Sequence, residues 1–282
     1  MIRKWTYLIL TVLCLGIFFL YLKMDSLAHD AVPPVIRIDE IPMEIYIDDP
    51  EDILFQGITA RDNLDGDVTD SLLIENITLS GEQGQATVSY AAFDSAGNVA
   101  KARREIRYID YAGPRFDLKQ ALVFPENAGI DVLNLVKAYD DMDGDISHWV
   151  RAMALDGDNL NTLGKHKIQV RVSNSMGDTA ILELPVDVIP AGQAQGILKL
   201  RDYVVYLKVG DPFDPTDYPL SYTLGNRTLE FNQKLPENFE LRIDNKADPQ
   251  TPGLYEVFYT LIYTENGYSY TGYSKLFVVV EG

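Results

Sequence analysis

Aspartate residues occur in two closely similar runs whose carboxylate oxygens are suited to a hard cation. Ala-Arg-Asp-Asn-Leu-Asp-Gly-Asp-Val-Thr (residues 60–69) returns 78 residues later as Ala-Tyr-Asp-Asp-Met-Asp-Gly-Asp-Ile-Ser (residues 138–147). Ca²⁺ takes about six to eight oxygen ligands, and a glycine allows the ligand loop to turn sharply. The runs and the hairpin that follows the first one supply candidate calcium ligands: Asp62, Asp65, Asp67, Asp94, Asp140, Asp143 and Asp145.

The same runs also fit tight turns without a metal. Asp and Asn side chains accept hydrogen bonds from nearby backbone amides, and Gly66 or Gly144 can adopt a positive φ. No helix is expected on either side of the runs, and no bidentate Glu stands at the twelfth position, so they are not EF-hand loops. A structural turn and a calcium site are therefore alternative hypotheses.

The order of the expected strands provides a geometric test. In an antiparallel arrangement, connections that are two strands apart emerge at the same end of the sheet. Asp94, at the end of the strand 86–93, should then lie near Asp62 or Asp65. In the second copy, Asn174 and Asp178 should lie near Asp140 or Asp143. Converging carboxylates repel one another when no cation is bound, so their convergence would favour calcium.

Tyrosine is the other residue type that suits a binding surface, because its ring can stack on a sugar or anchor a protein partner. The chain has 17 tyrosines, and ten of them follow residue 200. Tyr255 and Tyr259 align with core-facing positions of the first copy. The tyrosines beyond the Glu265-Asn266-Gly267 turn are the candidate ligand-binding residues: Tyr268, Tyr270 and Tyr273.

The elements that must position these residues are short strands. Ala86, Val88, Tyr90 and Ala92 alternate with small or polar residues, which is typical of a half-buried antiparallel strand. Residues 164–174 repeat the pattern, and residues 253–263 form a more diverged third copy. Proline and glycine mark the boundaries. We therefore expect an all-β protein of three tandem antiparallel β-sandwiches after one N-terminal membrane helix, with domains at 33–110, 111–190 and 197–282.

Three motifs carry a resemblance to a known family. Pro-Pro-Val-Ile (33–36), the run 60–69 and the hairpin Asp-Ser-Ala-Gly-Asn-Val-Ala (94–100) resemble the bacterial Ig-like domain family first noted in a pesticidal crystal protein. The resemblance covers 33–110 and extends over 111–190, where Asp178 replaces the hairpin Asn, but the Asp-Gly-Asp run is missing from 197–282. It implies tandem Ig-like β-sandwiches of a surface or secreted protein and does not imply an activity.

The amino terminus predicts the compartment. Residues 5–22 contain no charge and are preceded by Arg3-Lys4 and followed by Lys23. An apolar run of this length is near the minimum for crossing a bilayer, and basic residues on its short side favour a cytoplasmic N-terminus. We expect residues 1–24 to form a cytoplasmic stub and signal-anchor, with an extracellular C-terminal region. The alternative is signal cleavage after Ala28, which would secrete the protein.

Charge and composition exclude several functions. With 24 Lys and Arg against 42 Asp and Glu, the chain has a net charge of −18, which disfavours binding to nucleic acid or to anionic lipid head groups. A single cysteine, Cys14, excludes an intramolecular disulfide and a Cys-based zinc site. The sequence thus favours a non-catalytic, membrane-anchored cell-surface protein that acts as a spacer or binds a protein partner. The alternative is a module that binds glycan or cell wall through an aromatic face of the third domain.

Overall fold

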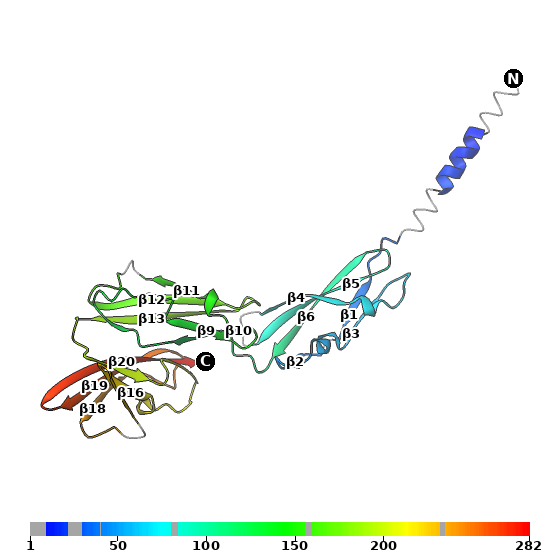
Figure 1. The fold of residues 1–282 in the computed structure, drawn as a ribbon. Coiled ribbons are helices and arrows are strands. Elements are labelled where there is room, and N and C mark those ends of the chain that lie inside the picture. Colours follow the sequence, from blue (N-terminus) through cyan, green and yellow to red (C-terminus); the bar gives the residue numbers. More distant parts are fainter. Residues whose placement is uncertain (1–9, 22–29, 40, 80–83, 156–158, 232–234) are drawn as a thin grey trace. The chain divides into compact units, whose positions relative to one another are not determined.

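The chain divides into two compact units, Met1–Tyr111 and Ala112–Gly282. The structure is a computed structural model that describes residues 10–21, 30–39, 41–79, 84–155, 159–231 and 235–282 (Figure 1). The predicted domains 111–190 and 197–282 both lie in the second unit, apart from Tyr111, which ends the first.

The N-terminal helix covers residues 10–21 (Figure 1). Every one of these residues is exposed. Among the described residues, no helix has both the length and the apolar character that a membrane crossing needs. The expected membrane segment 5–22 and the expected cleavage site at Ala28 extend beyond the described residues, which exclude 1–9 and 22–29.

The first unit has a two-stranded antiparallel sheet, in which β1 pairs with β3, and a second sheet with the strand order β2-β6-β5-β4. The predicted core-facing residues of β5 are buried, since Ala86, Val88, Tyr90 and Ala92 are at most 2% exposed. The alternation ends at Ala91, which was expected on the other face but is also buried, at 1%. These residues belong to the core of a sandwich-like pair of sheets. The elements of the unit are β1 (Val35–Ile38), β2 (Met43–Ile45), η1 (Glu51–Phe55), β3 (Ile58–Arg61), η2 (Thr69–Ser71), β4 (Leu73–Leu79), β5 (Gln85–Phe93) and β6 (Val99–Tyr108).

The first half of the second unit repeats this arrangement. Its sheets have the orders β10-β9-β7 and β11-β12-β13-β8, and β8 pairs in parallel with β13 as β2 does with β6. Ile168, Val170 and Val172 on β12 are buried as predicted. The elements are β7 (Arg115–Leu118), β8 (Val123–Pro125), β9 (Val136–Asp140), β10 (Gly144–Asp145), η3 (Ser147–Trp149), β11 (Arg151–Ala154), β12 (Gly164–Ser173) and β13 (Thr179–Ile189).

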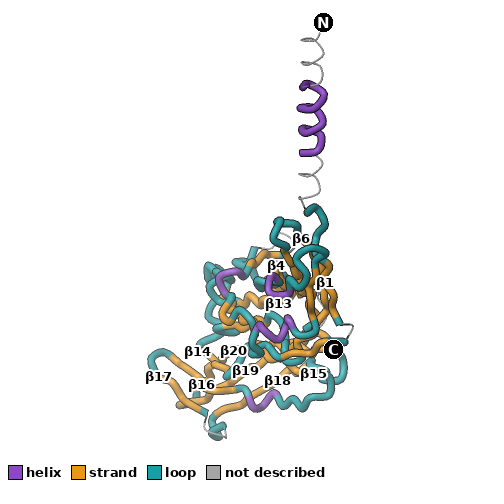
Figure 2. Tube along the Cα trace, turned by 90° about the vertical axis from the view of Figure 1, so that its right-hand side faces the viewer, coloured by secondary structure: helices purple, strands orange, loops and turns teal. Residues whose placement is uncertain are grey.

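The second half of this unit differs from the expected pair of separate sheets, because its strands form one seven-stranded sheet. Figure 2 shows this group of strands, in which β14 lies beside β20. The elements are β14 (Gly196–Leu200), β15 (Val204–Lys208), η4 (Pro215–Asp217), β16 (Pro219–Leu224), β17 (Arg227–Glu230), β18 (Phe239–Asn245), β19 (Gly253–Glu265) and β20 (Tyr268–Glu281).

Two glycines allow β14 and β20 to join. Gly196 pairs with Gly272, and the buried ring of Tyr222 lies over both. A Cβ at Gly196 would lie 2.3 Å from the Tyr222 ring, and one at Gly272 would lie 2.6 Å from it. Real Cβ atoms do not approach so closely, so the junction requires glycine on both strands.

A buried tyrosine supports the alignment of the third copy with the first. Tyr90 on β5 donates a hydrogen bond from its hydroxyl to the Leu54 carbonyl in η1, at 2.7 Å. Tyr259, at the matching position of β19, donates to the Pro215 carbonyl in η4, at 2.9 Å. Both rings are fully buried. Tyr255, which was expected to face the core, is only half-buried.

The two halves of the second unit share one hydrophobic core, which includes residues from Phe116 to Val280. On β20, residues 274–278 are all buried, so this strand is covered on both faces. Its outward face carries Lys275, which is 0% exposed and forms ion pairs with Asp187 of β13 and Glu256 of β19. The predicted tandem domains of this unit are therefore packed against each other.

Candidate cation site

Asp62 begins the first acidic loop and fixes its turn. One carboxylate oxygen, Oδ2, accepts hydrogen bonds from the amides of Leu64 at 2.6 Å and Asp65 at 3.0 Å. These bonds, with the Asp65 amide contributing most, lower the pKa of the Asp62 carboxyl below its usual value. Gly66 has a φ of +78°. Asp62 Oδ2 thus stabilises the loop as expected for a structural turn.

Asp65 ties the loop to the hairpin that follows β5. Its carboxylate accepts hydrogen bonds from the Ser95 amide at 2.7 Å and the Ser95 hydroxyl at 2.9 Å. In the second copy, Asp143 accepts the same two bonds from Ser175, at 2.6 and 2.8 Å. The third acid of each run also has local partners.

Asp67 accepts from the Thr69 hydroxyl at 2.6 Å and from its amide at 3.1 Å. The hydroxyl bond contributes most to lowering the pKa of the Asp67 carboxyl. Asp145 accepts from the Ser147 amide at 2.9 Å, and hydrogen bonds from Ser147 lower its pKa as well. These exposed acids stabilise the turns that lead into η2 and η3.

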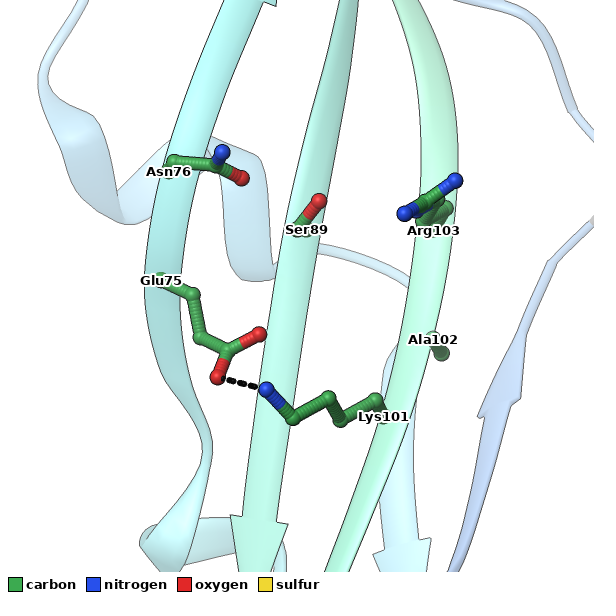
Figure 3. Close-up of a pocket in the computed structure, with 6 residues that line it drawn as sticks. All are labelled: Glu75, Asn76, Ser89, Lys101, Ala102 and Arg103. Carbon is green, nitrogen blue, oxygen red and sulfur yellow. Dashed lines mark hydrogen bonds and ion pairs between the residues drawn. The ribbon is translucent and has the colours of Figure 1, made fainter.

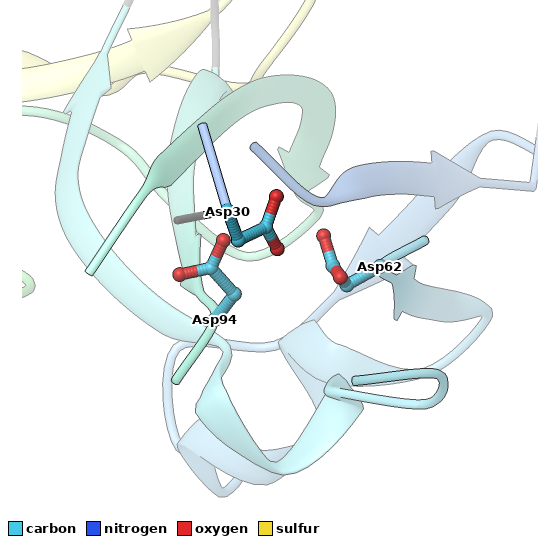
Figure 4. A group of neighbouring side chains, drawn as sticks. All are labelled: Asp30, Asp62 and Asp94. Carbon is cyan, nitrogen blue, oxygen red and sulfur yellow. The ribbon is translucent and has the colours of Figure 1, made fainter. Parts of the chain in front are cut away.

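Asp94 meets Asp62 as the strand order predicts, and Asp30 joins them (Figure 4). Each of the three residues, here called the acidic triad, has a carboxylate oxygen within 4.8 Å of the others. Asp62 and Asp94 are each 8% exposed, and Asp30 is half-buried. Among the described residues, no Lys, Arg or His forms an ion pair with any member of the triad.

Two oxygens of the acidic triad are buried without a hydrogen-bond partner among the described residues, namely Asp62 Oδ1 and Asp30 Oδ2. The other oxygens are engaged. Asp94 accepts from the backbone and side-chain nitrogens of Asn98, at 2.8 and 2.7 Å, and Asp30 Oδ1 accepts from the Val32 amide at 3.0 Å. Burying an ionised oxygen without a partner is costly, so the two free oxygens call for a positive group.

In the second copy, a side-chain amide hydrogen-bonds to the corresponding aspartate oxygen. Asn174 stands where the first copy has Asp94, and its Nδ2 donates to Asp140 Oδ2 at 3.1 Å. Asp140 Oδ1 accepts from the amides of Met142 and Asp143, as Asp62 does in its own loop. A neutral donor therefore occupies the position of the second carboxylate.

The seven predicted ligands thus have different roles. Asp62 and Asp94 come together, whereas Asp65 and Asp67 accept hydrogen bonds from Ser95 and Thr69. In the second copy, Asp140 accepts from Asn174, and Asp143 and Asp145 accept from Ser175 and Ser147. Asp30 was not among the residues predicted from the sequence. Because β1 runs antiparallel to β3, with Val35 opposite Arg61, the chain just before β1 lies beside the loop just after β3. The sequence feature that could have identified Asp30 is its position as an acid shortly before the Pro33-Pro34 boundary.

The three candidate tyrosines do not share one face. Tyr268 and Tyr270 lie on the side of β20 that faces the core, and the Tyr270 ring stacks on buried Tyr263 with 6.2 Å between centroids. Tyr273 points to the opposite side, because successive strand residues alternate, and its ring lies 5.9 Å from that of Phe258. Only Tyr268, at 68%, is widely exposed.

Several hollows occur on the described surface, including one in each unit. One, of about 580 Å³, lies over the outer face of β4, β5 and β6, and its Lys101 forms an ion pair with Glu75 (Figure 3). The other, of about 400 Å³, lies in the second unit between β8 and the strands β14 and β16, and Tyr203 and Tyr273 help to line it.

Comparisons with known proteins place few limits on function. No protein-family model matches the chain, and no curated protein matches it significantly. A solved structure of Clostridium perfringens ZmpB, described as CBM51-2 in complex with GlcNAc and INT domains, matches 55% of this chain and 41% of its own, with 16% identity and a TM-score of 0.22. The protocadherin GammaB4 extracellular domain matches 88% of this chain and 49% of its own, with 10% identity and a TM-score of 0.20.

The chain therefore spans less than half of either of these two structures. TM-scores near 0.2 do not establish a shared arrangement, so the function has to be argued from this chain's own residues.

Proposed function

We propose that the protein is a non-catalytic cell-surface protein, anchored by its N-terminal helix, that uses its extracellular β-domains as a spacer or to bind a protein partner. The observation that carries this proposal is the helix of residues 10–21. Its nine large apolar side chains are between 50% and 66% exposed and point in all directions. A helix that is apolar all round is typical of a segment surrounded by lipid.

The acidic β-domains agree with this orientation. Basic residues precede the apolar segment and favour a cytoplasmic N-terminus, while the excess of acids lies in the remainder of the chain. The shared core of the second unit supports a presenting role, because it fixes the two halves against each other. A partner bound to either half would then be displayed on a rigid support. A glycan platform would need aromatic side chains gathered on one face, and Tyr270 and Tyr273 point to opposite sides of β20.

Leu13→Arg tests the anchor. An arginine near the centre of a membrane helix costs about 2.5–3.5 kcal/mol of insertion free energy, so the full chain should shift from the membrane fraction to the soluble or secreted fraction. Leu13→Ala is the matched control, and it should remain in membranes after alkaline carbonate extraction.

Protease added to intact cells tests the orientation in the same experiment. It should digest the β-domains of the wild-type chain. Domains that are protected until the cells are lysed, or a Leu13→Arg chain that stays in the membrane fraction, would contradict the proposal.

A further inference from the structure

We propose that the acidic triad, Asp30, Asp62 and Asp94, binds one calcium ion, which ties the chain segment entering the first unit to the end of its sandwich. The proposal starts from geometry: three carboxylates reach within 4.8 Å of one another from three separate places in the chain (Figure 4). Ca²⁺ binds carboxylate oxygens at about 2.3–2.6 Å, so one ion between them can contact all three.

An unpartnered buried oxygen points to a ligand independently of the clustering. Asp62 is 8% exposed, and its Oδ1 has no hydrogen-bond partner among the described residues, although its Oδ2 accepts two amides. Asp30 Oδ2 is also buried and has no hydrogen-bond partner among the described residues. A hydrogen-bonded turn needs only one oxygen of Asp62, so the turn does not explain the burial of the second one.

In the second copy, a neutral side chain takes the place of Asp94, and no cation is required to compensate a second carboxylate there. There Asn174 replaces Asp94 and donates its amide hydrogen to Asp140 at 3.1 Å. The hairpin residue four positions later changes in the reverse direction, from Asn98 to Asp178. The two copies thus use the same backbone turn with different charges, and only the first has its acids grouped closely enough for a metal among the described residues.

The donor set favours calcium over other metals. All the available side-chain ligands are hard carboxylate oxygens, which suit Ca²⁺, Mg²⁺ or Mn²⁺ rather than a metal that prefers nitrogen or sulfur. The triad lies on a loop, a hairpin and an entering segment, and such mixed support suits the flexible coordination of Ca²⁺ better than the strict octahedron of Mg²⁺. Water would complete the ligand shell.

The ion would have a mechanical consequence. Asp30 directly follows residues 22–29 and is held to the hairpin by one hydrogen bond, from Asn98 Nδ2 to its carbonyl at 3.1 Å. A bound ion adds a second link between residue 30 and the loops after β3 and β5. The link lies where the chain from the N-terminal helix enters the first unit, so calcium would stiffen that connection.

Calcium binding is tested on the full chain in detergent, stripped with EDTA and titrated with CaCl₂ by calorimetry. We expect one ion per chain, weaker binding of MgCl₂, and a melting temperature of the first unit that rises by roughly 10 °C at a hundredfold excess over Kd. Absence of saturable calcium binding would overturn the proposal.

The discriminating variant converts the first copy to the pattern of the second, as Asp94→Asn with Asn98→Asp. It should lose the calcium response, and its melting temperature in EDTA should lie slightly below that of the wild type, because the change also removes the Asn98 Nδ2 hydrogen bond to the Asp30 carbonyl. Asp140→Asn in the second copy is the matched control and should bind calcium like the wild type. Calcium binding that survives in the double variant, or that is lost in the control, would contradict the assignment.

A third variant guards against misfolding. Asp30→Asn changes the least buried member of the triad and should weaken calcium binding at least tenfold without lowering the melting temperature in EDTA. Hydrogen exchange of the Val32 and Asn98 amides should slow on addition of calcium in the wild type and remain unchanged in this variant. Equal exchange with and without calcium in the wild type would exclude the stiffening.

Discussion

At the scale of single residues, carboxylates in the turns link stability to pH. Hydrogen bonds from Thr69 lower the pKa of Asp67 below its ordinary value of 3.8. A lowered pKa adds stability above the unfolded value, and this stability is lost as the pH falls through the folded value. Asp67→Asn should therefore be less stable than the wild type at pH 7, and the difference should narrow as the pH falls below about 4. Urea midpoints in EDTA at a series of pH values measure it.

Asp70→Asn is the control at this scale, because Asp70 is exposed in the next turn and has no side-chain hydrogen bond among the described residues. Its difference from the wild type should be small at each pH. A constant difference for Asp67→Asn over the whole range would show that the Thr69 bonds do not depend on the charge of Asp67.

At the scale of elements, the junction of β14 and β20 depends on the absence of two side chains. A methyl group at Gly272 would lie 2.6 Å from the Tyr222 ring and 3.0 Å from the Gly196 carbonyl. We expect Gly272→Ala to destabilise the second unit by about 1–3 kcal/mol, the usual cost of an overpacked site, and to leave the first unit unchanged. Thermal unfolding of the full chain, followed by calorimetry, measures both.

Tyr222→Leu supplies the control for this prediction. It removes the part of the ring that the new methyl group would meet, so Gly272→Ala should cost less in the Tyr222→Leu background than alone. Additive costs would show that the ring does not constrain the glycine.

At the scale of the whole molecule, Lys275 links the two halves of the second unit. Its ammonium is fully buried, forms ion pairs with Asp187 and Glu256, and donates to the Pro185 carbonyl at 3.1 Å. Lys275→Met leaves Glu256 without its buried partner and Asp187 with only the exposed Lys165, at 3.9 Å. Breaking a buried pair in this way costs about 3–5 kcal/mol. Hydrogen exchange should then accelerate in β13 as well as in β20, because the two strands share the contact.

Lys246→Met is the matched control, since Lys246 is exposed and lies 3.7 Å from the exposed Asp244. A surface pair contributes at most about 1 kcal/mol, so this variant should unfold like the wild type. Faster exchange confined to β20 in Lys275→Met would show that the two halves unfold independently.

Local patterns in the sequence determined much of the fold. Alternating residues on β5 and β12 predicted strands with one buried face, because the side-chain period of a strand is two and does not depend on its neighbours. Repeated motifs predicted the repeated strand order of the first two copies. That order in turn placed Asp94 near Asp62 and Asn174 near Asp140, since strand direction alone decides which loops share an end.

Other features depended on which distant segments meet. Asp30 joins the acidic triad because β1 pairs with β3, and Lys275 is buried because the outer face of β20 is covered by the preceding sandwich. A local pattern records whether a strand has a buried face, but not what covers its second face. Contacts between residues far apart in the sequence decide what covers the second face. Lys275, for example, carries a charge and yet is buried, where it pairs with Asp187, 88 positions away in the sequence. The tertiary structure alone therefore decided that Asp30 joins the acidic triad and how the two halves of the second unit pack.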